Sequence, residues 1–174
     1  MTGLPMTGTP MKLDGTVLGF DVGARRIGIA VGSAFGHGAR ALAVIDVHAH
    51  GPDWSAIDRL RNEWRPDGLV VGDPMTMEGG DQPIRRRAHE FARELSGRYR
   101  LPVVLVDERA SSIEAAQRFA ADRAEGRKKR RDAAALDAVA AAVIVERWLA
   151  SPQDAMRIDD APLPMTTPNH GAAE

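Results

Sequence analysis

Val17-Leu18-Gly19-Phe20-Asp21-Val22-Gly23 is an apolar run typical of a buried strand, with one carboxylate in its middle. A buried ionised carboxylate must be paired or bound to a metal, so Asp21 needs an explanation. Because side chains alternate along a strand, Gly19 and Gly23 flank Asp21 on its own face and leave room for a close approach to the backbone. Two interpretations stay open here: a metal or phosphate site on the sheet, or a structural aspartate bonded to nearby backbone amides.

The composition limits the class of protein. The chain has 174 residues, enough for one ordinary domain with its own core. It has no cysteine, which excludes disulfides, thiolate zinc sites and cysteine nucleophiles and fits a reducing compartment. Its apolar runs are too short to cross a bilayer, and residues 1–12 lack the pattern of a secretion signal. We therefore expect a cytoplasmic protein with no membrane partner.

Hydrophobic periodicity predicts one α/β domain over residues 16–150. A second strand, 26–32, forms a hairpin with the first, and a third apolar run follows at 41–47. Helix and strand then alternate, with helices predicted at 54–64, 84–99, 111–121 and 132–149 and strands at 68–72 and 103–108. This order predicts a mixed five-stranded sheet, three antiparallel strands plus parallel strands, with helices on both faces. We expect residues 1–15 to be a disordered leader and residues 151–174 a disordered tail.

Two further acidic positions resemble Asp21 in their apolar setting. At the end of the strand 103–108, alternation lets only one of Asp107 and Glu108 share a face with Asp21, and the spacing does not say which. Asp137 interrupts the last helix, which is otherwise almost entirely Ala, Val, Ile and Leu. Three carboxylates at close range would repel one another unless Mg²⁺ or Mn²⁺ lay between them. Such a site suits phosphodiester chemistry.

Basic residues are unevenly distributed. The formal net charge of the chain is −1, yet residues 17–149 hold 21 Lys or Arg against 19 Asp or Glu. The run Arg127-Lys128-Lys129-Arg130-Arg131 lies just ahead of the Asp137 helix. One interpretation is a solvated loop. The other is a basic loop that holds a nucleic-acid backbone while the acids hold metal.

Four motifs, taken in order, resemble one known family. The motifs are Asp21-Val22-Gly23-Ala24-Arg25-Arg26-Ile27-Gly28-Ile29-Ala30, Val70-Val71-Gly72 with Pro74 and Gly79, Val106-Asp107-Glu108-Arg109, and Asp137 with Ala140-Ala141. They closely resemble the YqgF (RuvX) family, which is similar to the RuvC Holliday-junction resolvases and has the RNase H-like fold. The resemblance covers about residues 17–149.

The resemblance implies a Mg²⁺- or Mn²⁺-dependent nuclease with Asp21, Glu108 and Asp137 as its catalytic and metal-binding acids. It thereby selects Glu108 over Asp107. The family is described both as a Holliday-junction resolvase and as the enzyme that matures the 5′ end of 16S ribosomal RNA. The implied partners are pre-rRNA or branched DNA and ribosomal particles, and the chain would act as a monomer or a homodimer. The residues expected to grip phosphates are Arg25, Arg26, Arg109, Arg127, Lys128, Lys129, Arg130 and Arg131.

The chain departs from the family pattern at two places. Asp73 stands where relatives usually have Leu, which adds an acid at a strand end near the expected site. Ala110-Ser111-Ser112 stands where relatives usually have Leu-Thr-Thr, and the serines keep the hydroxyls. Two other functions stay open: a noncatalytic nucleic-acid or ribosome-binding module, and an actin-like phosphotransferase, since a strand followed by Asp-x-Gly also opens the phosphate site of sugar kinases.

Overall fold

The computed structural model describes residues 11–36, 38–74, 83–108 and 133–161. The expected helix at 111–121 and the ends of the chain lie outside these residues. In chain order the elements are β1 (Thr16–Val22), β2 (Arg26–Ser33), β3 (Gly38–His48), β4 (Gly51–Pro52), α1 (Trp54–Trp64), β5 (Gly68–Asp73), α2 (Pro83–Tyr99), β6 (Val103–Asp107), α4 (Ala133–Ala150), η2 (Pro152–Asp154), β7 (Met156–Arg157) and η3 (Ile158–Asp160).

The strands form one mixed sheet in the order β4-β3-β2-β1-β5-β6-β7. β1, β2 and β3 are antiparallel neighbours, whereas β1, β5 and β6 run parallel. This arrangement confirms the predicted mixed α/β sheet, with three antiparallel strands followed by parallel ones. Within the described residues the sheet has seven strands rather than the predicted five, because β4 and β7 add an edge strand on each side. Each of these has two residues, too few to show an alternating pattern.

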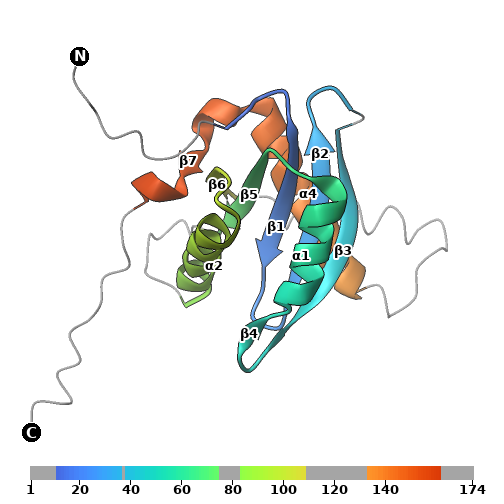
Figure 1. The fold of residues 1–174 in the computed structure, drawn as a ribbon, viewed down its shortest axis with the longest axis vertical. Helices are drawn as coiled ribbons and strands as arrows, with labels where there is room; N and C mark the ends of the chain where they lie inside the picture. The colour runs from blue at the N-terminus through green and yellow to red at the C-terminus, as the bar shows by residue number, and fades with distance from the viewer. Residues whose placement is uncertain (1–10, 37, 75–82, 109–132, 162–174) are drawn as a thin grey trace, which may run out of the picture.

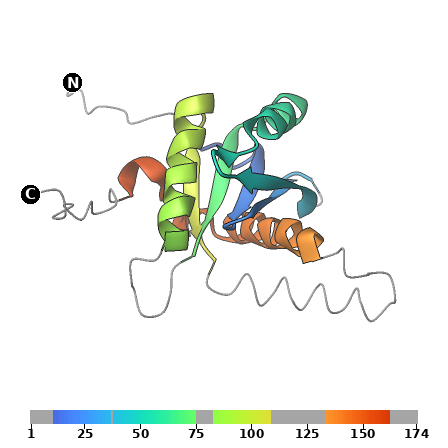
Figure 2. The ribbon, with the colours of Figure 1, turned by 90° about the horizontal axis from the view of Figure 1, so that it is seen from below.

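Helices cover both faces of the sheet. α1 and α2 lie on one face and α4 lies on the other (Figures 1 and 2). One core cluster joins alternate residues of β1, such as Leu18 and Phe20, to Ile57 of α1 and Phe91 of α2. A second cluster joins Val17 and the opposite side chains of the parallel strands to α4. The strand alternation predicted around Asp21 therefore separates two distinct layers of core.

The predicted helix boundaries follow from local chemistry. Asp53 caps α1, since its Oδ1 accepts a hydrogen bond from the Ala56 N–H at 3.2 Å. At the other end Arg65 adopts the left-handed conformation with φ 44°, and its N–H donates to the Arg61 carbonyl before Pro66 stops the helix. α2 and α4 begin and end within a residue or so of the predicted ranges.

The room left by Gly19 is filled by α4. A Cβ at Gly19 would lie 3.3 Å from the Ala141 carbonyl oxygen and would overlap the side chain of Val145. Gly23 instead closes the turn after β1, where its N–H donates to the Arg26 carbonyl at 2.9 Å. The glycine beside Asp21 on β1 therefore serves helix packing, a close approach that only a residue without a side chain allows.

The segment after α4 differs from the predicted disordered tail. Residues 151–161 form η2, β7 and η3, and β7 pairs with β6. Ile158 is 3 % exposed and packs in the core with α2 and β6. The proline-rich, polar composition of residues 151–174 led to the prediction of a disordered tail, because one buried isoleucine changes the average composition of a segment very little. Among the described helices none is long and apolar enough to cross a membrane.

Replacement of the buried anchor tests this packing. We expect Ile158→Ala to lower the free energy of unfolding by about 2–4 kcal/mol, the usual cost of truncating a buried aliphatic side chain. Met156→Ala is the matched control, because Met156 is 46 % exposed on the neighbouring strand and should change stability little. Urea unfolding of both variants gives the comparison. Equal, small effects would mean that this segment does not pack in solution.

Candidate active site

The structure brings Asp21 and Glu108 together on the α4 side of the sheet. Asp21 lies near the end of β1, and Glu108 directly follows β6. Their side chains are hydrogen-bonded across the intervening strand β5. Gly72 of β5 makes this possible, because a Cβ there would lie 2.5 Å from Oε2 of Glu108. Asp107 belongs by alternation to the opposite face, with Val103 and Leu105.

The two carboxyl groups share a strained electrostatic setting. The pKa of Asp21 is raised to about 6: burial raises it most, the hydrogen bond with Glu108 lowers it, and the nearby charge of Asp137 raises it. Burial, the charge of Asp21 and their hydrogen bond together raise the pKa of Glu108 to about 9. Near neutral pH Glu108 therefore keeps its proton and donates it to Asp21. This is the behaviour of carboxyl groups buried at close range.

Asp137 approaches the pair from the first turns of α4. Its Oδ2 accepts a hydrogen bond from Nε of Arg26 at 2.8 Å, and the side chain is 29 % exposed. α4 lies this close because Gly28 of β2 has no side chain: a Cβ there would overlap the Asp137 carbonyl. Within the residues described, no three His, Cys, Asp or Glu side chains are close enough to form a metal-binding group. Asp137 is paired with Arg26. Of the three predicted acids, Asp21 and Glu108 are the two that contact each other.

The raised pKa values predict how the stability of the chelator-treated protein depends on pH. A carboxyl group whose pKa is higher in the folded state favours folding at low pH, and this advantage is lost as pH rises from its unfolded pKa to its folded pKa. For Glu108 that window runs from the ordinary value, 4.5, to about 9. Between pH 5 and 8 we expect the free energy of unfolding to fall on the order of 2 kcal/mol more in the parent than in Glu108→Gln. Urea unfolding in EDTA measures both slopes, and parallel slopes would contradict the assignment.

Asp73 lies on the other face of the sheet from the acid pair. Asp73 is 5 % exposed, and its carboxylate accepts hydrogen bonds from Arg85 Nε at 3.0 Å and His89 Nε2 at 3.1 Å. Although burial raises its pKa, the bonds from His89 and Arg85 together hold the pKa of Asp73 below its usual value. Sequence reasoning missed this cluster. The available signal was Arg85 and His89, four residues apart on one helix after an acidic strand end.

The expected phosphate-gripping residues are described only in part. Arg25, in the turn after β1, and Arg26, the first residue of β2, are exposed, and Arg87 supports the turn by donating to the Ala24 carbonyl at 3.3 Å. Both arginines follow Asp21 closely in sequence, and Arg26 contacts Asp137 directly. Arg109 and the run 127–131 lie outside the described residues.

Comparison with known proteins identifies the family. Residues 15–151 match the RuvX family, described as "Holliday junction resolvase". The chain belongs to the RuvX family. It is 72 % identical over 145 residues to a protein named "Putative pre-16S rRNA nuclease" from Xanthomonas axonopodis pv. citri (strain 306), covering 83 % of this chain and 94 % of the relative. Proteins of the same name from three strains of Xanthomonas oryzae pv. oryzae are 73 % identical over 142 residues, covering 82 % of this chain and 92 % of theirs.

Among solved structures, the chain is similar to Thermus thermophilus RuvC, with a TM-score of 0.49 and 18 % identity, covering 82 % of this RuvX chain and 99 % of that one. A second match, with the same score and identity, is T. thermophilus RuvC in complex with a Holliday junction substrate.

Proposed function

We propose that this RuvX protein is a divalent-metal-dependent endonuclease that hydrolyses phosphodiester bonds of structured nucleic acid. The first candidate reaction is 5′-end maturation of pre-16S rRNA, and the second is Holliday junction resolution. The hydrogen-bonded carboxyl pair of Asp21 and Glu108, with Asp137 close enough to raise the pKa of Asp21, is the observation that supports the proposal most directly. Hydrolysis at such a site makes the protein a hydrolase in ribosome biogenesis or recombination.

The acid pair fits Mg²⁺ or Mn²⁺. Hard cations take carboxylate oxygens, and a cation would replace the proton that Asp21 and Glu108 now share. In this proposal Asp21, Glu108 and Asp137 hold the metal and are the catalytic acids. When bound, the cation supplies activation of a water nucleophile and stabilisation of the leaving oxygen. Asp137 would exchange its contact with Arg26 for this ligand role, which frees the Arg26 guanidinium for a substrate phosphate.

The remaining basic residues have a supporting role in the proposal. Phosphates on either side of the cleaved bond would be neutralised by arginine and lysine side chains. These are Arg25 and Arg26 between the bodies of β1 and β2, Arg109, and the run Arg127, Lys128, Lys129, Arg130 and Arg131. The partners would be pre-rRNA or branched DNA, and ribosomal particles if the RNA is the substrate. We propose a cytoplasmic protein that acts without a membrane, as a monomer on RNA or as a homodimer for two symmetric cuts across a junction.

A side-by-side cleavage assay tests the proposal. The purified chain, with Mg²⁺, Mn²⁺ or EDTA, is given a precursor ribosomal RNA and a four-way DNA junction. We expect metal-dependent cuts in at least one substrate and none in EDTA. Binding of both substrates without cleavage, unaffected by metal, would favour the noncatalytic module instead. Thermal stabilisation by ATP would favour the phosphotransferase, although the described residues form a single sheet rather than the two related domains between which those enzymes hold ATP.

A further inference from the structure

Asp73 connects α2 to the backbone of Glu108. Its side chain is anchored by the guanidinium of Arg85, at 3.0 and 3.4 Å, and by His89, at 3.1 Å. His89 is itself only 7 % exposed, so the anchor is shielded from water. At the same residue, the main-chain carbonyl accepts the Glu108 N–H at 3.1 Å. A movement of Asp73 would therefore move a hydrogen-bond partner of Glu108.

A second contact holds the same peptide unit from the opposite layer. Nη1 of Arg147, on α4, donates to the Asp107 carbonyl at 2.9 Å. The Asp107 carbonyl and the Glu108 N–H belong to one planar peptide group. Arg147 of α4 therefore holds the oxygen of this peptide group, and the Asp73 carbonyl holds its N–H. Asp73 is in turn held by side chains of α2. The direction of the Glu108 side chain over Gly72 depends on the orientation of this plane.

We infer that Asp73 is a positioning residue for Glu108, acting through the peptide group between Asp107 and Glu108. This inference rests on the proposed function, in which Glu108 is a metal ligand whose position affects metal binding. The Asp73 side chain lies on the other face of the sheet from the acid pair, and it is the main-chain carbonyl of Asp73 that accepts the Glu108 N–H. Removal of a group that orients a metal ligand commonly weakens metal binding 10- to 100-fold.

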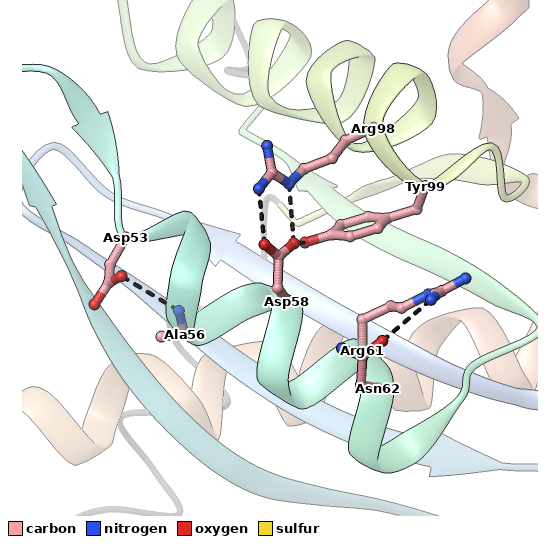
Figure 3. Close-up of polar contacts among 7 residues, drawn as sticks. All are labelled: Asp53, Ala56, Asp58, Arg61, Asn62, Arg98 and Tyr99. Carbon is pink, nitrogen blue, oxygen red and sulfur yellow. Dashed lines mark hydrogen bonds and ion pairs between the residues drawn. The ribbon is translucent and has the colours of Figure 1, made fainter.

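Three variants of the full chain test this inference. In Asp73→Leu both anchors to α2 are lost, whereas in Asp73→Asn the side-chain oxygen still accepts from Arg85 and His89. Asp58→Leu is the matched control. Asp58 of α1 accepts hydrogen bonds from Arg98 and Tyr99 of α2, at 2.9, 2.7 and 2.5 Å, and so forms a second, more exposed carboxylate cluster at the other end of α2 from Arg85 (Figure 3).

Two measurements are made on each folded variant. The first is hydrogen exchange at the Glu108 amide, which requires no metal. The second is the Mn²⁺ dissociation constant from calorimetry. We expect Asp73→Leu to speed Glu108 exchange and to weaken Mn²⁺ binding about tenfold. Asp73→Asn should stay close to the parent in both, and Asp58→Leu should lower only the overall stability.

The outcomes separate this inference from the proposed function. Unchanged exchange at Glu108 in Asp73→Leu overturns the inference, whatever the metal data show. Equal acceleration in Asp58→Leu also overturns it, because the effect would then be general destabilisation. A parent that neither binds Mn²⁺ nor cleaves nucleic acid overturns the proposed function, while the exchange data still decide whether Asp73 positions Glu108.

Discussion

Asp21→Asn is expected to abolish nucleic-acid cleavage and to leave the EDTA-treated protein as stable as the parent or more stable. A metal ligand lost from the site removes several kcal/mol of transition-state stabilisation, which corresponds to a fall in rate of about a thousandfold or more. Stability should not fall, because burial and the charge of Asp137 both disfavour the ionised form of Asp21, and the neutral amide removes these costs while its oxygen can still accept the Glu108 proton. Single-turnover cleavage and thermal unfolding in EDTA give the two values.

Asp67→Asn is the matched control for the structural alternative. Oδ2 of Asp67 accepts a hydrogen bond from the Thr16 N–H at 3.0 Å, so this aspartate holds the start of β1 in the way that a structural Asp21 would hold its end. We expect Asp67→Asn to cost about 1 kcal/mol of stability and to leave cleavage intact. If Asp21→Asn instead lowers the melting temperature in EDTA as Asp67→Asn does, Asp21 is structural and the proposed site is wrong.

The layers around Asp21 were predictable from the sequence because strand alternation is a local property. The side chains of Leu18 and Phe20 face α1 and α2, while Val17 and Asp21 face α4, as the period of two requires. The cap of α1 at Asp53 was predictable for the same reason. β4 and β7 were not, since two residues show no period and the sheet edge that they join is assembled from distant parts of the chain.

Several contacts in the candidate site could not be predicted from local sequence patterns. Alternation left Asp107 and Glu108 equivalent until the family resemblance selected Glu108, and the registers of β6 against β5 and of β5 against β1 set Glu108 beside Asp21. The contact between Arg26 and Asp137 joins residues 111 positions apart, and neither residue type predicts its partner. Asp73 was interpreted as an extra acid near the site. Its partners come from α2, and they turn it into a buried anchor on the opposite face.

Gly28→Ala is expected to reduce both stability and cleavage, because Gly28 sets the distance between β2 and the start of α4. A methyl group there would overlap the Asp137 carbonyl and lie 2.7 Å from the Ala138 nitrogen. These are backbone atoms of a helix, so no side-chain rotation can relieve the contact and α4 itself must move. Overpacking of this kind costs about 1–3 kcal/mol. Since Asp137 moves with the helix, we expect cleavage to fall by about tenfold or more, the usual consequence of misplacing a catalytic group.

Gly97→Ala is the control for this prediction, since Gly97 lies near the end of α2 with no atom within 4 Å of the added Cβ. Alanine in an exposed helix position should raise stability by about 0.5–1 kcal/mol and leave cleavage unchanged. Both variants are compared by urea unfolding and by cleavage at a temperature where each is folded. Gly28→Ala with parental stability would show that α4 does not seat on β2 through this glycine. Reduced stability with full cleavage would show that the position of α4 does not affect cleavage. Asp137 would then no longer be one of the proposed catalytic acids.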